Sequence, residues 1–197
     1  MSGDDKLIAL VINNNTVKLK KPDGINVATY KVPYSRIIEA LLSPDGETVA
    51  IATVKKIVQI WQRNRPAPQI LKGHQAEVWQ VVFSPDGRFI ASASGDGSVK
   101  LWTLDGKLFR TLVGHSAAVW RVAFSQDSKM VASGSGDNAV KLWTLDGKLL
   151  KTFKGHSTAI WGVAFSPNGK ILASGSVDAT VKLWSLDGTE ITTLKGP

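Results

Sequence analysis

A repeat of 41 residues runs through this chain of 197 residues and limits the folds that it can adopt. Four of the seven tryptophans are spaced 41 residues apart, and the other three form a second series with the same spacing. The two series are Trp61, Trp102, Trp143 and Trp184, and Trp79, Trp120 and Trp161. Residues 73–113 and 114–154 are identical at 25 of 41 positions. A fixed period between about 20 and 50 residues indicates an array of stacked units that share one backbone.

The same register extends to both ends of the chain, so we predict a single repeat array over residues 1–197. We expect a partial unit at 1–31, without the first strand of the others, and complete units at 32–72, 73–113, 114–154 and 155–197. The unit at 32–72 keeps the Ser-Pro-Asp-Gly sequence but has Val32-Pro33 where the later units have Gly-His. The first two units are therefore the most divergent copies.

Each unit reads as four short strands joined by turns. In the unit at 73–113 we expect strands at 78–83, 88–94, 99–102 and 107–113. The first turn, at 84–87, contains Pro85, which fixes φ, and Gly87, which accepts a positive φ. Since no segment of ten residues has the helical period, the sequence predicts an all-β fold.

Composition excludes several classes of protein. Without cysteine, the chain has no disulfide, iron–sulfur cluster or cysteine nucleophile. Its apolar runs are far shorter than the roughly 20 residues that span a bilayer, and its first five residues lack the basic character of a secretory signal. It also lacks a phosphate-binding loop and the spacing of a metal site. We therefore expect a cytoplasmic protein with no cofactor, no metal and no membrane partner.

The repeated motifs are Gly-His, then Phe-Ser-Pro-Asp-Gly, then Ser-Gly-Asp, then Val-Lys-Leu-Trp. In this order and at this period, the chain resembles the WD-repeat (WD40) β-propeller family, and within it the bacterial-type arrays of highly similar blades. The resemblance implies propeller blades, namely four complete four-stranded blades and one three-stranded N-terminal partial blade. The sequence departs from the family in the Trp-Asp pair, since Thr, Ser or Gln follows each tryptophan of the first series.

The resemblance also implies a structural hydrogen-bond tetrad in each of the last three blades. It joins the histidine, a serine of the second strand, the turn aspartate and the tryptophan of the third strand. The sets are His74, Ser92 or Ser94, Asp96 and Trp102; His115, Ser133 or Ser135, Asp137 and Trp143; and His156, Ser174 or Ser176, Asp178 and Trp184. The unit at 32–72 has Pro33 and Lys55 at the histidine and aspartate positions, so no tetrad forms there. We expect the two N-terminal units to be the least stable.

Histidine, serine and aspartate together also suggest a catalytic triad. A hydrolase needs one activated nucleophile in a cleft with an oxyanion hole. These residues instead recur three times at a constant period with a tryptophan attached, which is typical of a structural role. We therefore predict no catalytic residues.

The second tryptophan series is the candidate partner-binding face. In the family, the residue after the first apolar position of the innermost strand often faces the binding end. In this sequence that residue is Trp79, Trp120 or Trp161, and Ile38 in the divergent unit. Two residues before these positions the sequence varies between units, as at Arg36 and Glu77. Strand alternation offers another interpretation, because it places Trp79 on the same face as Val81 and Phe83, in the core between blades. The sequence leaves both open.

These features predict a non-enzymatic scaffold for protein–protein interaction. Exposed blade edges favour self-association, so we expect an oligomer or a part of a larger propeller. One alternative is nucleic-acid or anionic-ligand binding through the basic N-terminal blades, since the net charge is +8. Another is an accessory domain of a larger signalling or enzyme protein. The protein partner itself is unknown from sequence.

Overall fold

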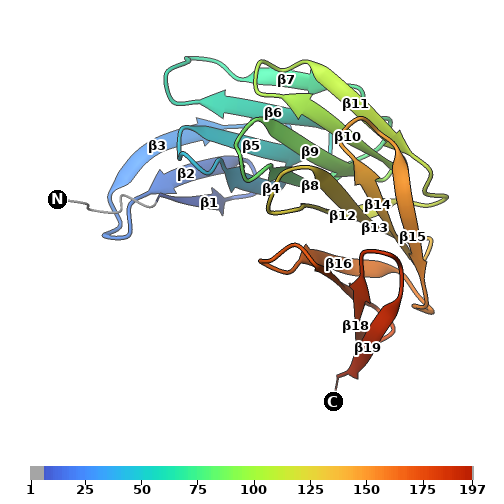
Figure 1. The fold of residues 1–197 in the computed structure, drawn as a ribbon. Coiled ribbons are helices and arrows are strands. Elements are labelled where there is room, and N and C mark those ends of the chain that lie inside the picture. Colours follow the sequence, from blue (N-terminus) through green and yellow to red (C-terminus); the bar gives the residue numbers. More distant parts are fainter. Residues whose placement is uncertain (1–6, 197) are drawn as a thin grey trace.

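The computed structural model describes residues 7–196, which form five antiparallel β-sheets and no helix. The sheets follow one another along an arc, and the chain passes from one sheet to the next in sequence order (Figure 1). The first sheet has three strands and the other four have four strands each. The architecture is therefore all-β and has the form of successive propeller blades.

Each sheet is a meander in which consecutive strands pair with each other. The first two sheets consist of β1 (Ile8–Ile12), β2 (Thr16–Lys20) and β3 (Asn26–Lys31), and of β4 (Ile37–Leu42), β5 (Thr48–Thr53), β6 (Ile57–Gln62) and β7 (Gln69–Lys72). The third and fourth consist of β8 (Val78–Phe83), β9 (Phe89–Ser94), β10 (Ser98–Thr103) and β11 (Leu108–Val113), and of β12 (Val119–Phe124), β13 (Met130–Ser135), β14 (Ala139–Thr144) and β15 (Leu149–Lys154). The fifth consists of β16 (Ile160–Phe165), β17 (Ile171–Ser176), β18 (Thr180–Ser185) and β19 (Glu190–Lys195).

The turn after each innermost strand is held by its own side chains. In the third sheet, Gly87 N–H donates to the Ser84 carbonyl at 2.8 Å, and the Ser84 hydroxyl donates to the Asp86 carboxylate at 2.5 Å. Gly87 has a φ of +68°, and Ser128 holds the same position in the fourth sheet at +59°. This turn therefore tolerates a non-glycine residue in the left-handed region.

The innermost strands carry a β-bulge that overturns the alternation argument for Trp79. Val78 pairs with Ser94, but the next pair joins Gln80 to Ala93, so Trp79 is an extra residue outside the regular register. A bulge shifts every following side chain by one position. As a result, Val78 and Val81 share the buried face, and Trp79 does not lie on that face with them.

Sheets pack on one another through apolar faces that repeat from blade to blade. The third sheet presents Val99, Leu101 and Leu112 to the fourth, where they pack against a cluster that includes Val122 and Trp143. All five side chains are at most 2% exposed. Burial of such apolar area, at roughly 25 cal/mol per Å², is the main force that holds successive blades together.

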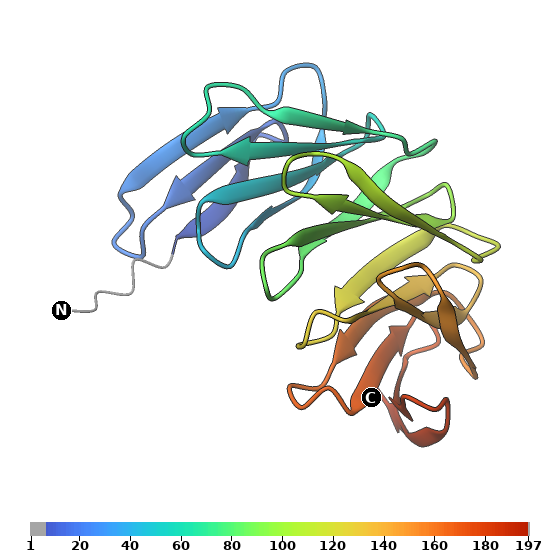
Figure 2. The same ribbon diagram turned by 45° about the horizontal axis from the view of Figure 1, so that its top comes forward.

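The first and the fifth sheet form the two ends of the arc, so β1 and β19 lie apart (Figure 2). Among residues 7–196, no helix has the length and apolar character that a membrane span requires.

Candidate functional site

In the third blade, a chain of hydrogen bonds links the histidine, serine, aspartate and tryptophan. The two nitrogens of the His74 ring lie 2.8 Å from the Asp96 carboxylate and 2.8 Å from the Ser92 hydroxyl. The Trp102 indole N–H donates to that same hydroxyl at 2.8 Å. Asp96 also accepts the backbone N–H of Gln75 at 2.8 Å, which ties the loop before β8 to the turn before β10.

The same arrangement occurs in the fourth and fifth blades with distances of 2.8–2.9 Å. The serine is Ser92, Ser133 or Ser174 in every case. The other candidates serve the loop, since Ser94 donates to the Ala76 carbonyl at 3.1 Å and accepts the N–H of Asp96 at 3.2 Å. Ser135 and Ser176 make the corresponding bonds in their own blades.

Burial and hydrogen bonding set the protonation of these groups. Burial lowers the pKa of His74 and His115, and this effect outweighs the opposing influence of the aspartate beside each ring. Burial alone would raise the pKa of Asp96, but hydrogen bonds from Ser98, the Gln75 N–H and His74 together lower it to about 2. Each set at these two histidines thus joins a neutral imidazole to a carboxylate at neutral pH.

The serine of each set is inaccessible to a substrate. Ser92, Ser133 and Ser174 are at most 1% exposed, and each hydroxyl already contacts an indole and an imidazole. A nucleophile needs access to the bond that it attacks. These three sets therefore act as internal braces that satisfy a buried indole and a buried imidazole.

The second tryptophan series forms a row of contacting rings across three blades. The centroids of Trp79 and Trp120 are 4.9 Å apart with the planes tilted by 42°, and those of Trp120 and Trp161 are 5.3 Å apart with the planes nearly parallel at 13°. Trp161 is 49% exposed, whereas Trp79 and Trp120 are half-buried. We call these three rings the tryptophan row.

Glycines lie below the first two rings of the row but not below the third. A Cβ on Gly95 would lie 3.2 Å from the Trp79 indole nitrogen, and one on Gly136 would lie 3.1 Å from that of Trp120. In the fifth blade, Val177 stands at this position. A ring placed as in the third and fourth blades would come close to this larger side chain, and no blade within residues 7–196 follows the fifth to cover Trp161.

A recess of about 270 Å³ lies at the tryptophan row, lined by Ile38, Glu39, Trp79, Trp120, Arg121 and Trp161. The Arg121 guanidinium lies 5.7 Å from the Trp161 ring centroid. Burial raises the pKa of Glu39, although the Val81 N–H, Arg121 and Gln80 oppose this effect. The recess thus combines an aromatic wall with one acidic and one basic group.

Glu39 and Arg121 were missed by sequence reasoning, which considered the positions before each tryptophan and not the one after. That position also varies, with Glu39, Gln80, Arg121 and Gly162 in successive blades. Glu39 accepts the Val81 N–H at 2.9 Å and Gln80 accepts the Val122 N–H at 2.8 Å, each from the next blade. Arginine has no acceptor for such a bond, and Arg121 instead donates to the Trp120 carbonyl at 2.9 Å.

The structure does not bring Arg36 and Glu77 into the recess. Arg36 is exposed in the loop before β4, and Glu77 is half-buried near Gly95. Both act through their backbone, because their carbonyls accept the N–H of Val54 and of Gly95 at 3.2 and 2.9 Å. Only Ile38 and the three tryptophans of the predicted face line the recess.

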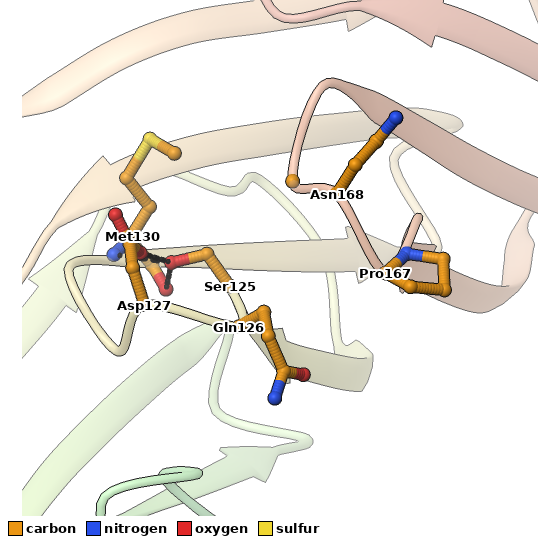
Figure 3. Close-up of a pocket in the computed structure, with 7 residues that line it drawn as sticks. Ser125, Gln126, Asp127, Met130, Pro167 and Asn168 are labelled. Carbon is orange, nitrogen blue, oxygen red and sulfur yellow. Dashed lines mark hydrogen bonds between the residues drawn. The ribbon is translucent and has the colours of Figure 1, made fainter.

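A second pocket, of about 340 Å³, lies at the opposite end of the blades, between the turns of the fourth and fifth sheets (Figure 3). Between the third and fourth sheets, the Ser128 hydroxyl bridges the gap by accepting the Asp86 N–H at 3.1 Å. Gly169 replaces that serine in the fifth sheet and has no hydroxyl. The pocket therefore lies where this side-chain bridge between neighbouring turns is absent.

Comparison with known protein families settles what the repeat is. The family model described as "WD domain, G-beta repeat" matches residues 67–103, 106–144 and 147–185, which together exceed half of the chain. The chain belongs to the WD40 family. A search of curated proteins gives no match.

The WD40 matches and the sheets are offset. The first match begins just before β7, the outermost strand of the second sheet, and ends with β10 of the third sheet. One sequence repeat therefore spans two blades. WD40 repeats generally serve as scaffolds for protein interaction, and the family is typically non-enzymatic. No three His, Asp or Glu side chains within residues 7–196 gather into a metal-binding group.

Proposed function

We propose that this WD40 chain is a non-enzymatic scaffold that binds a protein partner at the tryptophan row. The observation that supports this most directly is Trp161, which is 49% exposed and stacked on Trp120 beside a recess. A large aromatic side chain at the edge of a recess offers the kind of contact that dominates protein recognition. The braced blades behind it keep the row rigid, which lowers the entropic cost of binding.

The chemistry of the recess favours a peptide segment with a large apolar or aromatic side chain. Ile38 and the three indoles supply an apolar wall on which such a side chain can stack. Glu39 and Arg121 lie beside it and can bond the polar backbone of the same segment. We expect specificity to come from the apolar anchor and orientation from the two charged groups.

Selection of a peptide and one substitution test this proposal. Peptides selected from a displayed random library on the 197-residue protein supply the probe, and calorimetry gives its affinity. We expect Trp161→Ala to weaken binding at least tenfold, equivalent to about 1.4 kcal/mol, since large aromatic residues often act as hot spots. Leu150→Ala is the matched control, because Leu150 is also exposed but lies on β15, away from the row. Equal affinity for wild type and Trp161→Ala contradicts the proposal.

The second part of the proposal is that copies of the chain associate with each other. Both end sheets expose apolar side chains that the inner sheets bury, and this supports association of the ends. A partner-binding site would then be displayed several times in one assembly, which raises avidity without new contacts.

A further inference from the structure

The fifth blade exposes the face that every other blade buries against its neighbour. Val181 is 41% exposed and Leu194 is 54% exposed. At the same repeat positions, Val99 and Leu112 are each 1% exposed because the fourth blade covers them. Val140 and Phe153 are likewise at most 2% exposed beneath the fifth blade. We call the surface formed by Val181, Leu183 and Leu194 the C-face.

The first blade exposes the face that the other blades pack against the preceding blade. Ile8 is 49% exposed and Leu10 is 41% exposed, and both lie on β1. The repeat positions of Ile8 are fully buried in the other blades, as at Val49, Ile90 and Leu172. We call the surface formed by Ile8 and Leu10 the N-face.

We infer that the C-face of one copy of this chain binds the N-face of a second copy, so that chains join head to tail as successive blades. This inference rests on the self-association proposed above and specifies the two surfaces that carry it. The inner blades indicate the kind of surface that fits the C-face, because the same repeat positions there are covered by another blade of this chain. Nothing within residues 7–196 covers either face.

The chain already contains a junction of this composition. Where the first blade meets the second, Val17 and Leu19 pack against Val49 and Ile51, and all four side chains are fully buried. Val17 and Leu19 correspond to Val181 and Leu183 of the C-face. Val49 and Ile51 correspond to Ile8 and Leu10 of the N-face. The proposed contact would repeat this junction between two copies of the chain. The blade that supplies the N-face positions has no tetrad in either junction, since it is the second blade in one and the first blade in the other.

Contact between unlike faces has a consequence for symmetry. A head-to-tail interface is heterologous, so each copy keeps one free face after binding. Growth therefore continues, to a ring if the rotation between copies closes and to an open filament if it does not. A pair formed by two C-faces would be isologous and would stop at a dimer. The two arrangements are distinguished by variants that destroy one face at a time.

Two double variants are designed so that each keeps the sheet stable. Val181→Lys with Leu194→Glu places opposite charges on residues that face each other across β18 and β19. Ile8→Glu with Leu10→Glu places each new carboxylate opposite a lysine of β2, Lys20 and Lys18 respectively. All four positions are at least 41% exposed, so we expect both variants to keep the wild-type unfolding midpoint.

Light scattering over a concentration series gives the test. We expect wild type to exceed its monomer mass of 21.2 kDa increasingly with concentration, and each double variant to remain a monomer. An equal mixture of the two variants is expected to form dimers, since each variant keeps the face that the other has lost. Dimers of about twice the monomer mass in the mixture alone identify the head-to-tail contact.

Three outcomes overturn the inference. Wild type could remain a monomer up to its solubility limit, the mixture could fail to dimerise, or either variant could assemble on its own. Affinity for the selected peptide, measured on the two variants, separates this result from the fate of the binding proposal. If the variants bind the peptide but wild type never assembles, the proposed binding at the tryptophan row stands and only the proposed association of copies is refuted.

Discussion

The second and fourth blades have the same four-stranded fold but brace it in different ways. In the fourth blade, the Trp143 indole bonds the Ser133 hydroxyl at 2.9 Å, and that hydroxyl bonds His115 at 2.8 Å. In the second blade, the Trp61 indole bonds the Gln59 amide oxygen at 3.0 Å on its own strand. The position of the serine is taken by Ile51, which is fully buried.

Replacement of the serine by isoleucine removes a polar group from the core together with its partners. Pro33 and Lys55 stand at the histidine and aspartate positions, so no buried imidazole needs a bond in the second blade. Tyr30 of the first blade instead packs on Trp61 with ring centroids 5.1 Å apart. The blade fold therefore accepts either a linked hydrogen-bond network or apolar packing around this tryptophan, and it tolerates the buried Tyr30 hydroxyl, which has no hydrogen-bond partner among the described residues.

The largest expected effect comes from removal of the hydroxyl at the centre of a network. Ser133→Ala leaves the buried Trp143 N–H and a nitrogen of His115 without partners, at about 1–3 kcal/mol of unfolding free energy for each group. Gln59→Leu, the matched change in the second blade, leaves one indole N–H that is only half-buried, and we expect a loss below about 1 kcal/mol. Urea unfolding followed by circular dichroism measures both. Equal losses would mean that the two blades do not differ in their bracing.

Acid is expected to weaken the third and fourth blades before the first two. Burial lowers the pKa of His74 and His115, so below the unfolded value of about 6.5 the unfolded state binds more protons than the native state. The stability that these histidines confer is present above that pH and is lost as the pH falls. Asp96, with a pKa of about 2, adds a further loss below its unfolded value of 3.8.

Segment-resolved hydrogen exchange between pH 7 and pH 5, corrected for intrinsic rates, distinguishes the regions. Among the groups with a lowered pKa, only His74 and His115 titrate in this window, and both lie within residues 73–154. Carboxyl groups such as Asp45 in the second blade also have a lowered pKa, but they titrate at lower pH. A uniform loss of protection across residues 7–195 would contradict the prediction.

Most of the fold was predictable because one unit, once understood, describes its copies. The strand expected at 78–83 is β8 (Val78–Phe83), and the one expected at 88–94 is β9 (Phe89–Ser94). The turn sequences fix the ends of these strands by local chemistry, since proline and residues with positive φ act within the turn itself. The motifs alone predict the WD40 family and the all-β blades, and the family match and the five sheets confirm both.

The site was less predictable because it depends on geometry that strand alternation does not contain. The bulge at Trp79 breaks the period of two, and no local residue announces it. Ser92 and Ser94 are two residues apart on one strand, so alternation places both on the same face, and only the reach of His74 selects Ser92. Glu39 and Arg121 enter the recess from the second and fourth blades, on either side of the third, and are 82 residues apart in sequence.

The smallest expected effect concerns one turn residue that distinguishes the fifth blade from the third. Ala179 has a φ of +63°, and Gly97 has a φ of +80° at the same repeat position. A left-handed conformation costs an L-residue about 1–2 kcal/mol, and glycine avoids this cost. Glycine also makes the unfolded chain more flexible, which lowers the unfolding free energy by about 0.4–1 kcal/mol. We therefore expect Ala179→Gly to raise the unfolding free energy by about 0.5–1 kcal/mol, measured by urea unfolding.

The reverse change in the third blade supplies the control. Gly97→Ala places a Cβ only 3.3 Å from the Ala117 carbonyl oxygen of the fourth blade, in addition to the cost of its positive φ. We expect it to destabilise the protein by about 1–2 kcal/mol, more than Ala179→Gly stabilises it, because the turn of the third blade also has a neighbouring blade against it. Changes of equal size and opposite sign would show instead that the turn conformation alone sets the difference. The contact with the next blade would then contribute nothing at this position.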